Sequence, residues 1–345
     1  MSITDTYTEE WLQTPSPNSI HIYSRLYKPE NPKALVVFIH GFQEHVGRHE
    51  HIHAQLKARG IAVFAIDQRG FGRTAFGVKG SHHGTGYGRT GVDLQMGDLE
   101  HVTGAARERV PGLPTFLMGH SMGGGETLSY AARGSPGAKT LSGVIASSPL
   151  VGLTNPRSKL VRYVGGKAAV LMPWFSIPVK VEVEGLSHDI AANEAVLKDP
   201  LIVSSGTLKG VGEMLAEGDL LMSHHHKTWS KDMPVLILHG TDDPVTSHDT
   251  TKKFLDLLPS EVDKKLVSFQ GGYHELHHET DGMQERVVNE VTQWIEAHLG
   301  SPAAKPPAAP EVVVSPPSTS STEAAAAEPE SPTAPVPEDT ATPKL

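Results

Sequence analysis

The stretch TFLMGHSMGG at residues 115–124 decides how this chain folds. A short apolar run leads into Gly119-His120-Ser121-Met122-Gly123, and a helical pattern follows. A Gly-x-Ser-x-Gly turn between a strand and a helix exposes the serine hydroxyl beyond the strand end, because glycine permits a tight backbone approach. We therefore predict that Ser121 is a nucleophile at the edge of a sheet.

Other short apolar runs alternate with longer helical patterns along the chain. They cover residues 35–39, 61–66, 144–146, 235–238 and 266–269. Unbroken apolar strands separated by helices indicate an α/β fold, with a mostly parallel central sheet and helices on both faces. Ligands of such sheets bind beyond the carboxyl ends of the strands. The residues that follow each run are therefore the candidates for chemistry.

Composition limits the class of protein. The chain has 345 residues, no cysteine, 38 % hydrophobic residues and a formal net charge of −9. It can form a sizeable core, it has no thiol nucleophile or Cys-ligated metal, and it does not suit a nucleic-acid partner. We predict one domain over residues 1–300, with a lid inserted at about 150–232, where the strand–helix repeat stops. The acidic, Pro- and Ala-rich segment 301–345 is expected to be a disordered tail.

Targeting signals are not visible in the sequence. The first twenty residues carry Asp5, Glu9 and Glu10 and have no apolar run, unlike a secretory signal. The longest uncharged apolar stretch, 168–179, contains two prolines and is too short to span a bilayer. We expect a cytoplasmic protein that is not secreted, a monomer or weak dimer, able to lie on a membrane without crossing it.

A serine nucleophile needs a base, and the base needs an acid that orients it. In this kind of sheet the acid and then the histidine follow the serine along the chain. Asp243 follows the run at 235–238, and His274 follows the run at 266–269. We predict that these two residues complete a triad with Ser121, with Asp242 as the alternative acid.

Two backbone N–H groups should stabilise the negative charge that develops on an attacked carbonyl oxygen. One is expected from Met122, directly after the nucleophile, and the other from the loop after the first run, at Phe42. His40 in that loop is expected to shape the backbone and to take no part in catalysis.

Four blocks of the sequence together carry a family resemblance. They are HGFQEHVGR at residues 40–48, DQRGFG at 67–72, GHSMGG at 119–124 and YHELH at 273–277. The chain resembles the monoacylglycerol lipases of the α/β-hydrolase superfamily over roughly residues 19–299. The resemblance implies an α/β-hydrolase fold with a helical lid and no cofactor. It also implies hydrolysis of monoacylglycerols to glycerol and fatty acid through an acyl-enzyme.

The resemblance also assigns roles to individual residues. It implies a Ser121, Asp243 and His274 triad, with the N–H groups of Phe42 and Met122 as oxyanion donors. It places three further side chains around the pocket for the glycerol moiety: Glu44, Arg48 and His277.

The predicted lid has an apolar stretch with basic neighbours. Leu171, Trp174 and Phe175 lie close to Arg162 and Lys167 in the sequence. Basic residues beside an apolar patch suit an anionic lipid surface. We expect the lid to contact a membrane or lipid droplet, from which the enzyme collects its substrate.

Competing interpretations remain open from the sequence. The enzyme could be a broader carboxylesterase or lysophospholipase, and an inactive hydrolase-fold binding module is a further alternative. Residues 274–278 match the zinc motif H-E-x-x-H, which needs both histidines on one helix. Gly271 and Gly272 precede the motif, so we expect His274 on a loop and predict no metal. The runs of histidine elsewhere, such as 224–226, are expected to be solvated.

Overall fold

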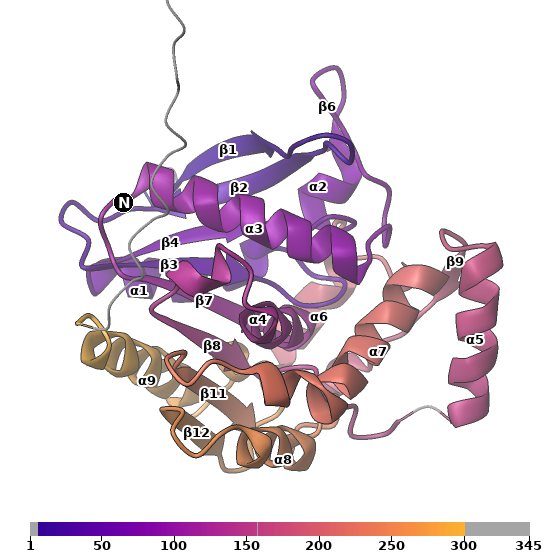
Figure 1. Cartoon of the computed structure of the whole chain (residues 1–345). Helices are drawn as coiled ribbons and strands as arrows, with labels where there is room; N and C mark the ends of the chain where they lie inside the picture. The colour runs from indigo at the N-terminus through magenta and orange to yellow at the C-terminus, as the bar shows by residue number, and fades with distance from the viewer. Residues whose placement is uncertain (1–5, 157, 301–345) are drawn as a thin grey trace, which may run out of the picture. The chain divides into compact units, whose positions relative to one another are not determined.

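Eight strands form the central sheet of the computed structural model, which describes residues 6–156 and 158–300 (Figure 1). The predicted tail at 301–345 lies outside these residues. The strand order is β1-β2-β4-β3-β7-β8-β11-β12. The strands are β1 (Thr8–Gln13), β2 (His21–Tyr27), β3 (Ala34–Ile39), β4 (Ile61–Ile66), β7 (Thr115–His120), β8 (Gly143–Ser147), β11 (Val235–Gly240) and β12 (Lys264–Phe269).

Most of the sheet is parallel. The six strands from β4 to β12 pair in parallel, and each contains one of the six apolar runs of the sequence. The two strands β1 and β2 add an antiparallel edge next to β4, which the sequence analysis did not predict. The predicted α/β fold is confirmed. Residues of β3, β4, β7 and β8 are buried throughout, because helices cover both faces.

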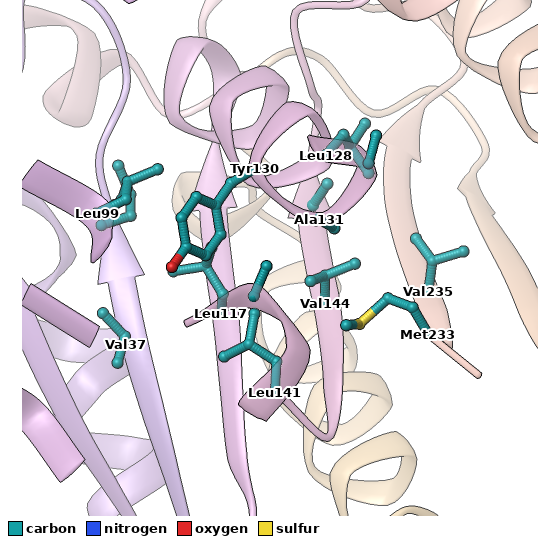
Figure 2. Close-up of a cluster of buried hydrophobic side chains, with 14 of the residues drawn as sticks. Val37, Leu99, Leu117, Leu128, Tyr130, Ala131, Leu141, Val144, Met233 and Val235 are labelled. Carbon is teal, nitrogen blue, oxygen red and sulfur yellow. The ribbon is translucent and has the colours of Figure 1, made fainter. Parts of the chain in front are cut away.

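Helices cover each face of the sheet over its own core. On one face α3 (Val92–Arg109), α4 (Ser121–Arg133) and α8 (His248–Leu257) pack over alternate strand residues. Figure 2 shows part of this core, where Leu99, Leu128 and Tyr130 meet Leu117 and Val144 of the sheet. On the other face, α1 (Glu50–Ala58) and α9 (Met283–Ala297) cover the second core. The alternation of side chains along each strand divides the apolar residues between the two faces.

The segment between β8 and β11 departs from the strand–helix repeat. Its longer elements are α5 (Lys159–Leu171), β9 (Ser176–Pro178), α6 (Ile190–Lys198), β10 (Ser205–Thr207) and α7 (Leu208–Ser223). Helix α7 lies against α4, and α5 stands outside α7 (Figure 1). Arg162 of α5 pairs with Asp219 of α7. The role of the segment between β8 and β11 as a lid stays a prediction.

A short helix and a small hairpin follow β4. Helix α2 (Gly72–Phe76) leads into a small hairpin of β5 (Gly77–Val78) and β6 (His82–His83).

Among the described residues, no helix combines the length and apolar composition needed to cross a bilayer.

Candidate active site

Ser121 is the first residue of α4 and follows the last residue of β7 directly, so the chain turns sharply at this position. Its backbone has φ of +54°, a left-handed conformation that costs a non-glycine residue about 1–3 kcal/mol. The neighbouring glycines permit this turn, since a Cβ at Gly123 would collide with the carbonyl oxygens of Ile39 and His40. This strained turn places the Ser121 hydroxyl at the carboxyl edge of the sheet.

His274 connects Ser121 to Asp243. The His274 Nε2 atom lies 2.9 Å from Ser121 Oγ, and His274 Nδ1 lies 2.8 Å from Asp243 Oδ2. His274 and Asp243 are both buried, whereas Asp242 is exposed and bonds to Thr241. The structure therefore brings together the three residues that the sequence singled out, and it places Asp243 rather than the alternative Asp242 beside the imidazole.

Several groups hold the Asp243 carboxylate in position. Its Oδ1 accepts hydrogen bonds from the backbone N–H groups of Val245 at 2.8 Å and Thr246 at 2.9 Å. Its Oδ2 lies 2.8 Å from the Thr246 hydroxyl and 3.1 Å from His239 Nε2. The sequence analysis missed His239 and Thr246. The sequence offered only their positions as a signal, because His239 is the second-last residue of β11 and Thr246 lies three residues after Asp243.

The charges of Asp243 and His274 favour transfer of a proton to His274. Burial alone would raise the pKa of Asp243, but the facing His274 and His239 imidazoles and their hydrogen bonds hold that pKa far below its usual range. Burial would lower the pKa of His274, but the Asp243 carboxylate raises it above the ordinary 6.5. Asp243 is therefore ionised, and it stabilises the protonated form of His274.

The loop after β3 approaches Ser121 from the other side. A Cβ on Gly41 would lie 2.9 Å from Ser121 Cβ, so only glycine allows this approach. The Phe42 ring contacts Phe71 at 5.5 Å between centroids, and it also lies against Gly206 of β10. The loop backbone thus runs beside the nucleophile, while the Phe42 side chain packs against the segment between β8 and β11.

Two further residues stabilise this loop. His40 Nε2 accepts from the N–H of Gln68 at 2.8 Å, and His40 Nδ1 lies 2.7 Å from the carbonyl oxygen of Gly41. Gln43 has φ of +62°, and its amide donates to the carbonyl oxygens of Val179 and Ser205. His40 therefore has the position expected of a loop-shaping residue. The sequence analysis did not assign a role to Gln43.

Glu44 and Arg48 belong to a buried ion-pair cluster beside the triad. Arg48 donates to both oxygens of Glu275, at 2.6 and 2.7 Å, and to Glu44 at 3.1 Å. The other Glu44 oxygen accepts from the Gly41 N–H. These bonds connect the loop beside Ser121 to Glu275, the neighbour of His274. The carboxylates of Glu44 and Glu275 both accept hydrogen bonds from Arg48. The contact of Glu44 and Arg48 with glycerol stays a prediction.

His277 lies in a stack of imidazoles next to this cluster. Its ring is 4.3 Å from His49 and 4.8 Å from His120, which is itself 5.0 Å from His274. Burial and the neighbouring imidazoles lower the pKa of His277 well below its ordinary value, and burial lowers that of His120 to about 3. His277 and His120 are therefore neutral, and they add polar groups without adding charge. Glycerol binding by His277 stays a prediction.

Within residues 6–156 and 158–300, two groups of side chains are close enough together to hold a metal ion. In each, three ligand atoms lie within 4.8 Å of one another: Glu275 with His277 and His278, and Glu44 with His120 and Glu275. Arg48 occupies oxygens of both carboxylates, and its positive charge opposes a cation there. The H-E-x-x-H motif lacks its helix, because His274 precedes a short 3₁₀ turn at Leu276–His278 and bonds to Ser121.

Comparisons with known proteins show the family of this chain. The family model described as serine aminopeptidase, S33, matches residues 30–281. A putative monoglyceride lipase of Schizosaccharomyces pombe is 34 % identical over 85 % of this chain and 72 % of its own length. The monoglyceride lipase of Saccharomyces cerevisiae is 30 % identical, over 79 % of this chain and 87 % of its own. The chain belongs to the monoacylglycerol lipase family of α/β-hydrolases.

A solved structure supports the same membership. A soluble variant of the Saccharomyces cerevisiae monoglyceride lipase, in complex with a substrate analog, superposes with a TM-score of 0.75 at 28 % identity, covering 84 % of this chain and 96 % of that one. The predicted resemblance is therefore confirmed, and the chain is an α/β-hydrolase family enzyme. The matched region 30–281 contains Ser121, Asp243 and His274.

Proposed function

We propose that Ser121, His274 and Asp243 form the catalytic triad of a monoacylglycerol lipase. The observation that carries this proposal is the unbroken contact from Ser121 Oγ through His274 to Asp243, at 2.9 and 2.8 Å. A neutral imidazole at this distance can take the hydroxyl proton as the serine attacks an ester carbonyl. Acyl transfer is the chemistry that this arrangement performs.

The oxyanion that forms needs hydrogen-bond donors at the same edge. Met122 is the second residue of α4, and the first N–H groups of a helix have no partner within the helix. The positive end of the helix dipole adds to this preference for negative charge. The loop that Gly41 brings beside Ser121 continues into the N–H of Phe42. We assign Met122 and Phe42 as the donors, each worth about 3–4 kcal/mol of transition-state stabilisation.

The reaction then proceeds in two stages. Ser121 attacks the ester carbonyl, His274 receives the hydroxyl proton, and Asp243 stabilises the imidazolium. Collapse of the tetrahedral intermediate breaks the ester bond, and His274 returns the proton to the departing glycerol oxygen. Water, activated by the same imidazole, attacks the acyl-enzyme and releases the fatty acid.

The substrate class rests on the relatives. Lipases named for monoglycerides match 79–85 % of this chain. Rates measured side by side on mono-, di- and triacylglycerols and on a lysophospholipid test the substrate. We expect monoacylglycerols to give the highest kcat/KM, and a preference for the lysophospholipid would contradict the proposal.

The triad is tested by single substitutions. Ser121→Ala and His274→Ala should each lose at least about a thousandfold in kcat while keeping the wild-type unfolding temperature. His83→Ala, an exposed histidine of β6, is the matched control and should keep full turnover. A fluorophosphonate probe should label the wild type and His83→Ala but not Ser121→Ala. Wild-type turnover in either triad variant would refute the assignment.

We further propose that α5 and the residues after it bind a lipid surface. Leu171 is 83 % exposed, Phe175 56 % and Trp174 39 %, and they form part of a larger group of exposed apolar side chains. The others are Leu160, Val161, Tyr163, Val164, Val170 and Met172. Exposed apolar side chains gathered in this way mark an interaction site. Lys167 adds positive charge beside them, whereas the charge of Arg162 is paired with Asp219.

Vesicle sedimentation tests this surface. Replacing Leu171, Trp174 and Phe175 by Ser should lower binding to anionic phospholipid vesicles at least about tenfold, because about 25 cal/mol is lost for each Å² of apolar area that no longer leaves water. Hydrolysis of a short soluble ester should stay at the wild-type rate. Unchanged vesicle binding would exclude this role for the patch.

A further inference from the structure

Gln43 is a buried residue in a strained conformation directly after Phe42, one of the two proposed oxyanion donors. The residue is 5 % exposed, and its φ of +62° lies in the left-handed region, which is unfavourable for any residue other than glycine. A strained residue persists only where the surrounding structure holds it in place. The contacts of Gln43 therefore indicate what its conformation serves.

The side chain of Gln43 joins the loop after β3 to the segment between β8 and β11. Its Nε2 atom donates to the carbonyl oxygen of Val179 at 2.9 Å and to that of Ser205 at 3.0 Å. Val179 directly follows β9, and Ser205 begins β10, which pairs with β9 in a small antiparallel sheet. The two N–H groups of one amide thus bond to both sides of the β9–β10 sheet.

Two neighbours of Gln43 in the loop contact the same segment. A Cβ added at Gly206 of β10 would lie 2.9 Å from Phe42 Cζ, so the Phe42 ring packs directly against the backbone of that strand. His45 Nε2 lies 2.9 Å from Asp199 Oδ2, just after α6. The loop is therefore fastened to the segment between β8 and β11 by three of its side chains.

The Phe42 N–H lies between two anchored parts of this loop. Before it, the Gly41 N–H donates to Glu44, and Gly41 passes close to Ser121. After it, the two carbonyl oxygens hold Gln43. An oxyanion donor has to be in position before the reaction, because preorganised donors need no rearrangement as the negative charge develops.

We propose that Gln43 is a positioning residue, which fastens the loop to the β9–β10 sheet and thereby directs the Phe42 N–H toward the oxyanion. The segment between β8 and β11 then supports catalysis in addition to the lipid contact proposed for it. Phe175 of that lipid-binding surface directly precedes β9, so the surface and the oxyanion loop are connected through a single short strand. The inference rests on the proposed lipase function, because it assigns a support to one of its oxyanion donors.

Gln43→Gly tests this role, because glycine removes the amide bonds and adopts a positive φ without strain. With a short soluble ester, kcat and kcat/KM should both fall at least about tenfold while KM changes less than about twofold, since a displaced donor weakens the stabilisation of the transition state alone. An alkyl boronic acid forms a tetrahedral anionic adduct with Ser121, and its affinity should also fall at least about tenfold. The pH at the inflection of kcat/KM should not move, because the triad is untouched.

Tyr87→Phe is the matched control. It removes a hydroxyl that accepts from the Val203 N–H at 2.9 Å, which is another bond to the same segment but one made outside the oxyanion loop. This variant should keep kcat within about twofold of wild type. Gln43→Asn is a second test variant: it keeps an amide and tolerates a positive φ, but it is one methylene shorter and cannot keep both bonds. It should lose at least about threefold in kcat.

The outcomes decide the proposal as follows. Folded Gln43→Gly with wild-type kcat or wild-type affinity for the boronic acid overturns it. A displaced pH inflection, or an equal loss in Tyr87→Phe, overturns it as well. The unfolding temperature shows whether each variant is folded, and if Gln43→Gly is not, the kcat of Gln43→Asn decides by the same criteria.

The same measurements separate this proposal from the lipase function. Wild-type hydrolysis of monoacylglycerol by Gln43→Gly leaves the lipase function intact and removes the role of Gln43. Fluorophosphonate labelling of the wild type without hydrolysis of any monoacylglycerol refutes the lipase function, while the rates on the short ester still test Gln43.

Discussion

Replacing Arg48 by Met should destabilise the protein strongly, because it leaves two buried carboxylates without their partner. The Arg48 side chain is 9 % exposed, and those of Glu44 and Glu275 are 6 % and 3 % exposed. Removing one partner of a buried ion pair costs about 3–5 kcal/mol. For a domain of about 300 residues, whose entropy of unfolding is about 0.6 kcal/mol/K, that corresponds to a fall in Tm of about 5–8 °C. If Arg48 acted only by binding glycerol, KM would rise and Tm would not change.

The stability lost on replacing Arg48 by Met should decrease as the pH falls. Burial would raise the pKa of Glu275, but Arg48 lowers it to about 2 in the folded protein. A lowered folded pKa contributes stability that is present above the unfolded value, near 4.3, and is lost as pH falls toward 2. Without Arg48 this contribution disappears. The difference in stability between wild type and Arg48→Met should therefore shrink as pH falls from 5 toward 2.

Urea unfolding followed by tryptophan fluorescence measures the free energy of unfolding of wild type and Arg48→Met at pH 7 and pH 3. Arg162→Met is the matched control, because its partner Asp219 is 65 % exposed and a surface pair contributes about 0–1 kcal/mol. The reasoning is refuted if Arg48→Met costs no more than Arg162→Met at pH 7. A difference from wild type that stays the same at pH 3 would also contradict it.

Three further predictions concern the triad and its loop. The kcat/KM should rise with pH through an apparent pKa above 6.5, because Asp243 favours protonated His274 and only the neutral imidazole accepts the proton; an inflection below 6.5 would be inconsistent with this. Gly41→Ala should lower kcat at least about a hundredfold in steady-state assays, since its Cβ would lie 2.9 Å from Ser121 Cβ and displace the oxyanion loop. Thr246→Val should cost about 1.5–3 kcal/mol in urea unfolding, because it removes a hydroxyl 2.8 Å from the Asp243 carboxylate, and an unchanged midpoint would count against that bond.

Much of the fold was predictable because it depends on local pattern. Each of the six apolar runs is a strand of the parallel sheet. Five of these strands are buried throughout, and a strand buried on both faces needs mostly apolar residues, whereas β12 at the sheet edge is only partly buried. The two edge strands were missed. β1 contains several exposed residues. β2 is mostly buried, but it contains the polar Ser24 and the charged Arg25, which pairs with Glu50. Such strands do not show an apolar run.

The candidate site was predictable as residue types but not as contacts. Strand ends pointed to Ser121, Asp243 and His274, which lie up to 153 residues apart and meet within hydrogen-bond distance. The family pattern pointed to Glu44 and Arg48, and the structure shows that their charges bond to each other and to Glu275. The pairing of buried charges depends on which chain segments meet, and no local pattern records it.

The sequence by itself therefore determined the parallel sheet, the serine in its strained turn and the residues at the strand ends, because strand burial and glycine geometry are local properties. Tertiary structure decided which aspartate faces His274, which groups hold its carboxylate and how Arg48 joins the loop beside Ser121 to Glu275. Burial and the surrounding charges control each of these features, and both arise only when distant segments pack together.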